Sequence, residues 1–223
     1  MMEIIYSRLL DANFSRTSFP ISFPVVVHGV PGCGKSTFIK SLLDCEEFSA
    51  QSYGVVRPTN LAGRGVEKAL QPLQPGFNVL DEYLSGPSYE GFDLLLSDPY
   101  QNFRKPLTAH FINSNTYRFG VSVCQFLNKL GFEINSCKEE DTELIFGKVF
   151  GGEIRGEIIC FEAEVEEILR KHSAKFHHPC NLRGAEFDHV TFITAHQDLQ
   201  EIVGPDLYVS LTRATKSLTI LSP

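Results

Sequence analysis

The stretch VVVHGVPGCGKSTFIKSLL, residues 25–43, constrains the fold of this chain more than any other part of the sequence. Its β-branched start predicts a buried parallel strand, and the apolar residues after the glycines recur with helical spacing. Gly29, Gly34, Lys35 and Ser36 match the pattern G-x-x-x-x-G-K-S/T. In this pattern several backbone N–H groups point into one concavity at the start of a helix, where the helix dipole also favours anions. The sequence therefore predicts a strand, a polyphosphate-binding loop and a helix in that order.

The loop is expected to supply both nucleotide contacts and part of a metal site. Lys35 is expected to reach the β- and γ-phosphates of ATP, and the Ser36 hydroxyl to complete the coordination shell of Mg²⁺. Cys33 is interpreted as a small residue that fills the turn; the alternative hypothesis is that its thiol makes nucleotide turnover sensitive to thiol reagents. The expected ATP-binding residues are Gly29, Val30, Pro31, Gly32, Cys33, Gly34, Lys35, Ser36 and Thr37.

The composition disfavours several classes of protein. With 43% hydrophobic and 21% charged residues among 223, the chain has the composition of an ordinary globular protein. Its net charge of −7 argues against a broadly basic protein that coats nucleic acid, while a local basic groove stays compatible with that charge. The six cysteines form no C-x-x-C pair, which favours reduced cytosolic thiols over a disulfide framework. No apolar stretch is long enough to span a bilayer, so neither secretion nor membrane spanning is expected.

Beyond the loop, strand-like runs alternate with helix-like runs, which predicts an α/β fold with a mostly parallel sheet. A polar connector over residues 104–118 predicts a domain boundary near residues 113–115. We therefore expect two domains, residues 1–114 and 115–223. The sequence predicts a short strand, a glycine loop and a second helix within 53–70, strands at 77–83, 92–97, 142–150, 153–161 and 187–195, helices at 120–132 and 161–172, and a helix, turn and strand over 204–222.

Polar side chains follow two of the predicted strands. Asp81 and Glu82 end the run FNVLDEY, and Gln101 ends the run FDLLLSDPYQ. Such strand ends line the ligand crevice of open α/β sheets. One carboxylate can hold Mg²⁺ while its neighbour activates the attacking water, which suits hydrolysis better than transfer to a second substrate. An amide beside the triphosphate can sense whether the γ-phosphate is present.

Two arginines outside the first half follow apolar stretches in polar turns. They are Arg118 in TYRFG and Arg213 in SLTRAT. Guanidinium groups that face the γ-phosphate from a second domain would stabilise the transition state and make hydrolysis depend on domain closure. The positions of the two arginines in the sequence are compatible with this role but do not establish it.

Six segments in chain order resemble those of a known family: GVPGCGKS, VLDEY, SDPYQ, TYRFG, LRGAEFDHVTFITAH and DLYVSLTRATKSLTIL. The set resembles the superfamily 1 RNA helicases of plant positive-strand RNA viruses. The short length and the opening RTSFPISFPVVVHGVPGCGKS resemble, more narrowly, the first proteins of the triple gene block, which are movement proteins of potexviruses and carlaviruses. The resemblance runs from about residue 14 to residue 221.

The resemblance implies a P-loop NTPase fold with two RecA-like parallel-sheet domains, a minimal superfamily 1 helicase core. It implies that residues 1–114 bind ATP and that residues 115–223 carry the arginine fingers and the fourth to sixth helicase motifs. The catalytic residues that it implies are Lys35, Glu82 as general base, Gln101 at the γ-phosphate, and Arg118 and Arg213 as arginine fingers. Asp81 would hold Mg²⁺ with Ser36.

The resemblance also implies an RNA-binding surface. Gly184, Glu186 and Phe187 match the fifth helicase motif, which couples RNA contact to the nucleotide, and Thr212 matches the sixth. The segment RPTNLAGRGV lies where the family has an RNA-contacting motif, and its candidates are Arg57, Thr59 and Arg64. The sequence departs from the family at Ser97, where a glycine is common. It also ends soon after Arg213, which leaves little room for inserted subdomains, so we do not expect strong duplex unwinding.

The resulting interpretation is a minimal motor with ATP in the cleft between its domains and single-stranded RNA, the viral genome, on the opposite surface. RNA binding should be largely independent of sequence and should fall with salt. The resemblance adds cell-to-cell transport of viral RNA through plasmodesmata and suppression of host RNA silencing. It implies self-association and contact with the coat protein, the other triple gene block proteins and the host silencing machinery. The implied locations are the host cytoplasm and plasmodesmata, with the host nucleus as a further compartment.

Three alternatives to this interpretation remain. A small-molecule or nucleotide kinase would share the phosphate loop but would not need the Asp81–Glu82 pair. An RNA-binding, self-assembling scaffold with vestigial ATPase activity is a second, and a piece of a replicative helicase is a third, which the compact opening before the loop disfavours. The segment HSAKFHHPC invites a zinc interpretation, but its spacing is irregular and a second ligand pair is lacking, so a polar loop is favoured.

Overall fold

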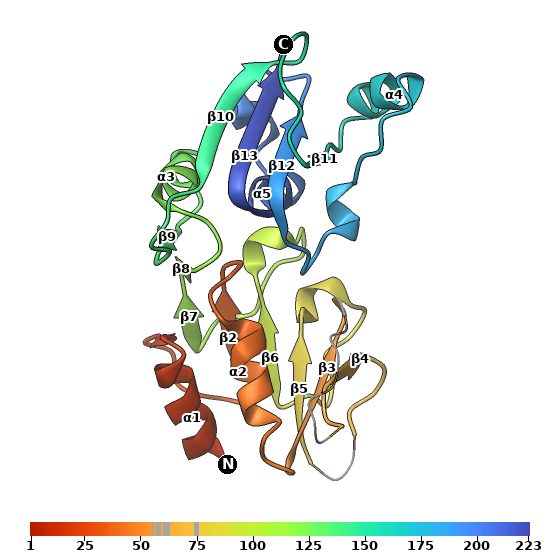
Figure 1. Cartoon of the computed structure of the whole chain (residues 1–223). Coiled ribbons are helices and arrows are strands. Elements are labelled where there is room, and N and C mark those ends of the chain that lie inside the picture. Colours follow the sequence, from red (N-terminus) through yellow and green to blue (C-terminus); the bar gives the residue numbers. More distant parts are fainter. Residues whose placement is uncertain (55, 57–58, 60–62, 74–75) are drawn as a thin grey trace. The chain divides into compact units, whose positions relative to one another are not determined.

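The computed structural model describes residues 1–54, 56, 59, 63–73 and 76–223 of the chain (Figure 1). It divides into two compact units, Met1–Ser114 (unit 1) and Asn115–Pro223 (unit 2). Each unit combines parallel strands with helices, so the predicted α/β class is confirmed. In the described part of the chain, no helix has both the length and the apolar character needed to cross a membrane.

Unit 1 is built on one sheet. Among the described residues, its seven strands lie in the order β1-β7-β2-β6-β5-β3-β4, and every neighbouring pair is parallel except β1 with β7. The elements are α1 (Met2–Asp11), β1 (Ser15–Arg16), β2 (Val25–Gly29), α2 (Lys35–Leu42), β3 (Phe48–Ser52), β4 (Val66–Lys68), β5 (Phe77–Asp81), η1 (Tyr83–Ser85), β6 (Leu94–Ser97), η2 (Pro99–Gln101) and β7 (Phe111–Asn113).

The core of unit 1 follows from the apolar runs of the sequence. Strands β2 and β6 are buried along their whole length, as expected for central strands of a parallel sheet that is covered on both faces. Helix α2 buries Phe38, Ile39 and Leu42, which share the face predicted from their spacing.

Several features of unit 1 differ from the sequence prediction. Strand β3 ends at Ser52, before the segment from residue 53 in which a short strand was expected. The helix expected after the glycine loop is wrong, because Val66–Lys68 forms strand β4 and pairs with β3. The Gln51 side chain fixes the end of this pairing: its Nε2 donates to the Gln71 carbonyl at 2.7 Å, and its Oε1 accepts from the Leu70 N–H at 2.9 Å. Tertiary pairing of this kind overrides local helix propensity.

The connector expected over residues 104–118 is also more ordered than predicted. It contains β7, in which Phe111 is fully buried, and the strand β8 (Asn115–Thr116). Strand β7 joins the sheet between β1 and β2, so its backbone pairing is satisfied although its sequence is short and partly polar. Helix α1, which was not predicted from the sequence, buries Ile5 and Leu9.

Unit 2 contains a smaller sheet. Within the described residues its four strands lie in the order β10-β13-β12-β11, all parallel, and a separate parallel pair joins β8 to β9. The remaining elements are α3 (Val121–Lys129), β9 (Asn135–Ser136), β10 (Glu143–Lys148), β11 (Glu157–Ile159), α4 (Ala163–Lys171), η3 (Pro179–Asn181), β12 (Phe187–Ile193), η4 (Leu199–Ile202), α5 (Pro205–Leu211) and β13 (Ala214–Ser222). Of these, α3, β10, β11, α4, β12, α5 and β13 confirm the helices and strands predicted for this half of the chain, whereas β8, β9, η3 and η4 were not predicted.

The direction of the strands places the polar segments of unit 1. Strands β2, β5 and β6 are parallel neighbours, and their arrowheads point the same way in Figure 1. The phosphate loop follows β2 and the segment from Asp98 to Gln101 follows β6, while Asp81 ends β5 and Glu82 comes directly after it. All three therefore leave the sheet at its carboxyl edge, where open α/β sheets bind their ligands.

Candidate active site

The phosphate loop has the backbone geometry that its glycines predict. Gly32 and Gly34 have φ angles of +76° and +101°, in the left-handed region that favours glycine. Gly34 caps helix α2, so Lys35, Ser36 and Thr37 form its first turn. At Gly29 the need is for space, because a Cβ atom there would lie 2.4 Å from the Cys33 Sγ.

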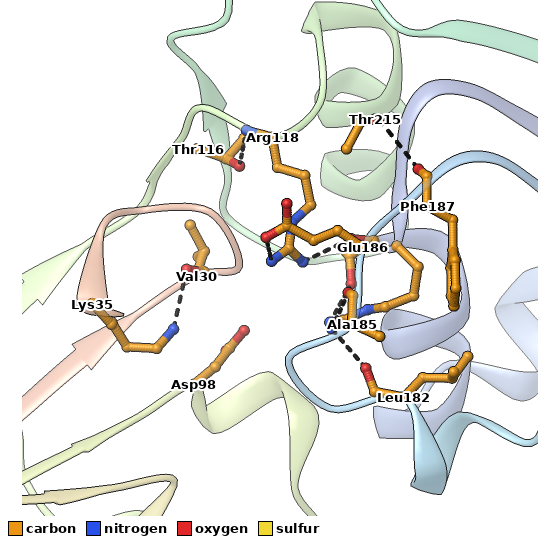
Figure 2. Close-up of polar contacts among 12 residues, drawn as sticks. Val30, Lys35, Asp98, Thr116, Arg118, Leu182, Ala185, Glu186, Phe187 and Thr215 are labelled. Atoms are coloured by element: carbon orange, nitrogen blue, oxygen red, sulfur yellow. Dashed lines mark hydrogen bonds and ion pairs between the residues drawn. The ribbon is translucent and has the colours of Figure 1, made fainter. Parts of the chain in front are cut away.

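The Lys35 side chain folds back over this loop. Its Nζ donates to the Gly29 carbonyl at 2.6 Å and to the Val30 carbonyl at 3.2 Å (Figure 2). Burial disfavours its positive charge, but the Cys33 thiol and the carboxylates of Asp98, Glu82 and Asp81 outweigh that effect and raise the pKa of Lys35. Lys35 therefore stays protonated at a site where an anionic ligand would need a positive charge.

Asn113 braces the phosphate loop from strand β7. Its side-chain Nδ2 donates to the Cys33 carbonyl at 3.3 Å, and its backbone carbonyl accepts from the Val30 N–H at 3.1 Å. The sequence prediction missed this role. A single asparagine at the end of a short strand gives no signal until the strand is known to lie beside β2.

Glu82, the predicted general base, has an unusual backbone conformation. Its φ angle of +54° places a non-glycine residue in the left-handed region. The Ser97 hydroxyl donates to its Oε2 at 3.4 Å. Ser97 is the position at which the sequence departs from the helicase family, and the structure shows that this departure places a hydroxyl against the carboxylate of Glu82. Strain at a carboxylate beside a phosphate loop is typical of a functional position.

Asp98 holds the predicted γ-phosphate sensor. Its Oδ2 accepts from Gln101 Nε2 at 3.0 Å, and its Oδ1 accepts from the Tyr100 N–H at 3.0 Å. Burial raises the pKa of Asp98, and the positive charge of Lys35 and the Gln101 hydrogen bond act in the opposite direction. Both side chains are buried, which fixes the direction of the Gln101 amide.

His28 and Tyr83 connect the strand before the phosphate loop to the turn after Glu82. Tyr83 Oη lies 3.0 Å from His28 Nε2 and accepts from the Leu107 N–H at 3.0 Å. Either group can donate in the His28–Tyr83 hydrogen bond, because the phenolic oxygen both donates and accepts, and a neutral imidazole fits both directions. Burial and the nearby charge of Lys35 lower the pKa of His28 to about 4, and burial raises the pKa of Tyr83 to about 12. Neither residue was among those predicted from the sequence.

The RNA-contacting candidates of unit 1 are only partly described. Arg57 lies outside the described residues. Thr59 is exposed and Arg64 is half-buried, and both precede strand β4. Their RNA-binding role stays a prediction.

Arg118 is held within unit 2 by a charged partner. Its Nη2 donates to Glu186 Oε1 at 2.7 Å, and its Nη1 donates to the Thr212 carbonyl at 3.1 Å (Figure 2). The Arg118 side chain is 7% exposed, whereas that of Glu186 is 48% exposed. One partner of this ion pair is therefore buried and the other is open to solvent.

Arg213 is the more deeply buried of the two predicted arginine fingers, with only 1% of its surface exposed. Its guanidinium donates to the carbonyls of Val209, Leu182 and Ala185 at 3.1, 3.1 and 3.4 Å, and to Thr212 Oγ1 at 3.0 Å. In this conformation Arg213 supports the interior of its own unit.

The segment predicted to couple RNA to the nucleotide touches both arginines. Glu186 pairs with Arg118, and two of the three carbonyls that hold Arg213 are those of Leu182 and Ala185, on either side of the turn where Gly184 has a φ angle of +82°. Phe187 begins β12 and donates its N–H to the Arg213 carbonyl at 3.0 Å. Thr212 bonds to both guanidinium groups. These predicted residues form one connected network.

The histidine-rich segment after α4 makes local contacts. His177 Nε2 lies 2.8 Å from Glu157 Oε2, and its ring stacks on Phe187 at 5.6 Å. His178 Nδ1 contacts the Sγ of Cys180 at 3.0 Å. Among the described residues, no group of three or more His, Cys, Asp or Glu side chains is arranged to hold a metal ion.

Comparison with known proteins identifies the family. A family model described as the viral superfamily 1 RNA helicase core domain matches residues 25–222. The chain belongs to this family. The matched region includes the strand, phosphate loop and helix from β2 to α2 and the polar segments that follow them.

Relatives within this family are similar over nearly their whole length. The movement and silencing protein TGBp1 of Apple stem pitting virus (isolate PA66) is 44% identical, covering 99% of this chain and 100% of the relative. The TGBp1 of Poplar mosaic virus (isolate ATCC Pv275) is 37% identical, covering 100% and 97%. The TGBp1 of Potato virus X (strain CP) is 31% identical, covering 98% and 97%. The predicted resemblance to first proteins of the triple gene block is thereby confirmed.

Solved helicases share the fold at low sequence identity. An arterivirus nonstructural protein 10 helicase in complex with DNA has a TM-score of 0.59 and 17% identity over 88% of this chain. The PRRSV helicase has a TM-score of 0.59 and 15% identity over 100% of this chain. The chain spans only 60% and 54% of these two proteins.

Proposed function

We propose that this chain is an RNA-stimulated, Mg²⁺-dependent ATPase of the helicase type that carries viral RNA from cell to cell and suppresses host RNA silencing. The observation that supports the ATPase most directly is the buried Lys35, which folds over a phosphate loop and whose pKa is raised by the charges of Asp98, Glu82 and Asp81. The names of its relatives support the movement and silencing roles. By resemblance, its partners are single-stranded viral RNA, further copies of the chain, the coat protein, the other triple gene block proteins and the host silencing machinery.

The residues of unit 1 fit a nucleotide with its metal ion. The loop N–H groups and Lys35 would bind the phosphates, and the oxygens of Ser36 and Asp81 suit Mg²⁺, which prefers hard oxygen ligands. Bound Mg²⁺ would neutralise charge on the β- and γ-phosphates. The carboxylate environment that raises the pKa of Lys35 includes Asp81, which supports a shared site.

Each remaining side chain has a definite task in hydrolysis. Glu82 would accept a proton from the attacking water, with its carboxylate positioned by the Ser97 hydroxyl. Gln101, oriented by Asp98, would contact the γ-phosphate. Arg118 and Arg213 would stabilise the charge of the transition state.

The network in unit 2 supports a link between RNA and these arginines. Glu186 is half-exposed and its partner Arg118 is buried, so an RNA phosphate near Glu186 would compete for the same guanidinium. The carbonyls of Leu182 and Ala185, in the same segment as Glu186, accept hydrogen bonds from Arg213. We infer that RNA contact with this segment changes how the arginines are held, and hence the rate of hydrolysis.

The test is Mg²⁺-dependent ATP hydrolysis with and without single-stranded RNA, for the wild type and for Glu82→Gln. Loss of a general base lowers a rate by roughly 10²–10⁴-fold, so the variant should be almost inactive. Glu90→Gln is the matched control, because Glu90 is an exposed carboxylate in the same unit. Equal RNA-stimulated rates in the wild type and the Glu82 variant would refute the assignment.

The deep burial of Arg213 favours a second candidate function, an RNA-binding scaffold with vestigial ATPase activity. An arginine that supports its own unit does not need to take part in hydrolysis. A Lys35→Ala protein that binds RNA and supports movement as well as the wild type would favour this scaffold. Loss of movement in that variant, with RNA binding intact, would favour the motor.

A further inference from the structure

The loop of residues 102–107, between η2 and β7, presents an aromatic side chain to solvent. Phe103 is 79% exposed, and the residues on its C-terminal side, Arg104 and Lys105, are exposed as well. An isolated apolar side chain on a surface needs no explanation by itself. An aromatic ring followed by two cations is a different arrangement, because it pairs a stacking surface with the charges that attract phosphate.

This loop is braced at both ends. Asn102, which is buried, donates from Nδ2 to the Asp98 carbonyl at 3.2 Å and accepts at Oδ1 from the Ser85 hydroxyl at 3.2 Å. At the other end the Leu107 N–H donates to Tyr83 Oη at 3.0 Å. The Arg104 guanidinium also donates to the Gly86 carbonyl. The ring of Phe103 is therefore exposed on a loop whose backbone is fixed, which lowers the entropy that a ligand would have to remove.

The position of the loop connects it to the candidate active site. It follows β6 at the carboxyl edge of the sheet, directly after Gln101. Asp98 is the shared anchor, because its carboxylate holds the Gln101 amide and its carbonyl holds Asn102. A ligand that binds the loop and a change in the position of Gln101 would therefore both affect Asp98.

We propose that residues 102–107 form a base-stacking site for single-stranded RNA. The Phe103 ring stacks on one nucleobase, and Lys105 contacts a neighbouring phosphate. Unpaired bases stack on aromatic side chains with little regard to sequence, because every base has a π face. The proposal rests on the proposed function, since it requires that the chain binds RNA.

The chain contains no tryptophan, which allows a direct spectroscopic test. Phe103→Trp introduces a single tryptophan at the proposed stacking position, whose emission can be excited selectively over that of the seven tyrosines. Phe150→Trp is the matched control, because Phe150 is 87% exposed in unit 2 and lies after β10. Titration of the full chain with a single-stranded oligouridylate should quench the tryptophan emission of the Phe103→Trp variant and leave that of the Phe150→Trp variant almost unchanged.

Affinity measurements complete the test. Phe103→Ala should weaken binding of the same labelled oligonucleotide on the order of tenfold, and Phe150→Ala should bind like the wild type. Lys105→Ala should lower the slope of log affinity against log salt by about 0.7, the contribution of one phosphate contact on a single strand. Phe103→Ala should leave that slope unchanged.

The outcomes separate this proposal from the proposed function. If the wild type does not bind the oligonucleotide, RNA binding fails and the stacking site fails with it. If the wild type binds and both Phe103 variants behave like their Phe150 counterparts, the stacking site alone is refuted. That second result would leave the exposed ring as a contact for a protein partner.

Discussion

Acidification should weaken unit 1 through one buried histidine. His28 Nε2 lies 3.0 Å from Tyr83 Oη, and burial together with the charge of Lys35 disfavours the protonated imidazole. Its pKa falls from 6.5 to about 4 on folding, so protons bind the unfolded chain more tightly than the folded one. The stability that neutral His28 provides is therefore complete above pH 6.5 and is lost as the pH falls toward 4.

The size of this effect follows from the two pKa values. Linkage between values of 6.5 and about 4 gives a loss of about 2 kcal/mol in the free energy of unfolding between pH 7 and pH 5. Most of this loss occurs before the ordinary carboxylates begin to titrate. The magnitude is large enough to measure, because a whole domain is stable by only about 5–15 kcal/mol.

The assay compares the wild type with His28→Gln at both pH values. The amide that this substitution introduces can keep a hydrogen bond to Tyr83 Oη but does not titrate, so the variant should lack this part of the pH dependence. Hydrogen exchange of the β2 amides reports on unit 1 alone, which matters because two units need not unfold together. His110, whose pKa is also lowered, is common to both proteins, and its effect cancels in the difference. Equal losses in the two proteins would refute the reasoning.

Three further perturbations test other parts of the molecule. Arg213→Lys should lower the free energy of unfolding by about 2–4 kcal/mol in a urea titration, because a lysine cannot replace the four hydrogen bonds of the guanidinium. The control Arg170→Lys, on the exposed face of α4, should lower it by less than about 0.5 kcal/mol. Similar losses in the two variants would contradict a structural role of Arg213. Asn113→Ala should raise the dissociation constant of an ATP analogue about fivefold, since the Cys33 carbonyl loses its donor, and unchanged affinity would show that the brace is dispensable. In native protein at neutral pH an alkylating reagent should modify the exposed Cys137 and Cys180 long before Cys33, because the Cys33 thiol is buried and burial raises its pKa. A mass spectrometric time course measures the three rates. Equal rates would support the alternative hypothesis of a reactive thiol in the phosphate loop.

The sequence predicted the elements whose pattern is local. A β-branched run, a glycine turn and a helical spacing identify β2, the loop and α2 without any knowledge of neighbours. Strand β4 was missed because its three residues have no strand pattern of their own; they extend only because β3 lies beside them. Strand β7 was missed for the same reason, since its polar ends satisfy their backbone groups by pairing with β1 and β2.

The site residues likewise divide into those with a local sequence pattern and those without one. Lys35, Glu82 and Gln101 could be proposed from motifs because each belongs to a short segment that follows an apolar strand. Asn113 and Tyr83 could not, because their contacts join segments far apart in the chain: Asn113 reaches Cys33, and Tyr83 reaches His28 and Leu107. A contact between distant segments has no periodic signature, so only the folded structure identifies these residues as partners of the site.

The two predicted arginine fingers differ in how readily they could act on a phosphate. Release of Arg213 would break four hydrogen bonds of its guanidinium, to the carbonyls of Val209, Leu182 and Ala185 and to the Thr212 hydroxyl, and hydrogen bonds of a charged group contribute about 1.5–3 kcal/mol each. The Val209 and Leu182 carbonyls would keep the backbone N–H groups of Thr212 and Ala185 as donors. Release of Arg118 breaks one carbonyl contact and an ion pair with Glu186, a carboxylate that water can reach and solvate. A phosphate would also replace the charge that Arg118 gives up, so exchange of partners costs little. If one arginine acts at the γ-phosphate, we therefore expect it to be Arg118, with Arg213 positioning the segment that holds it.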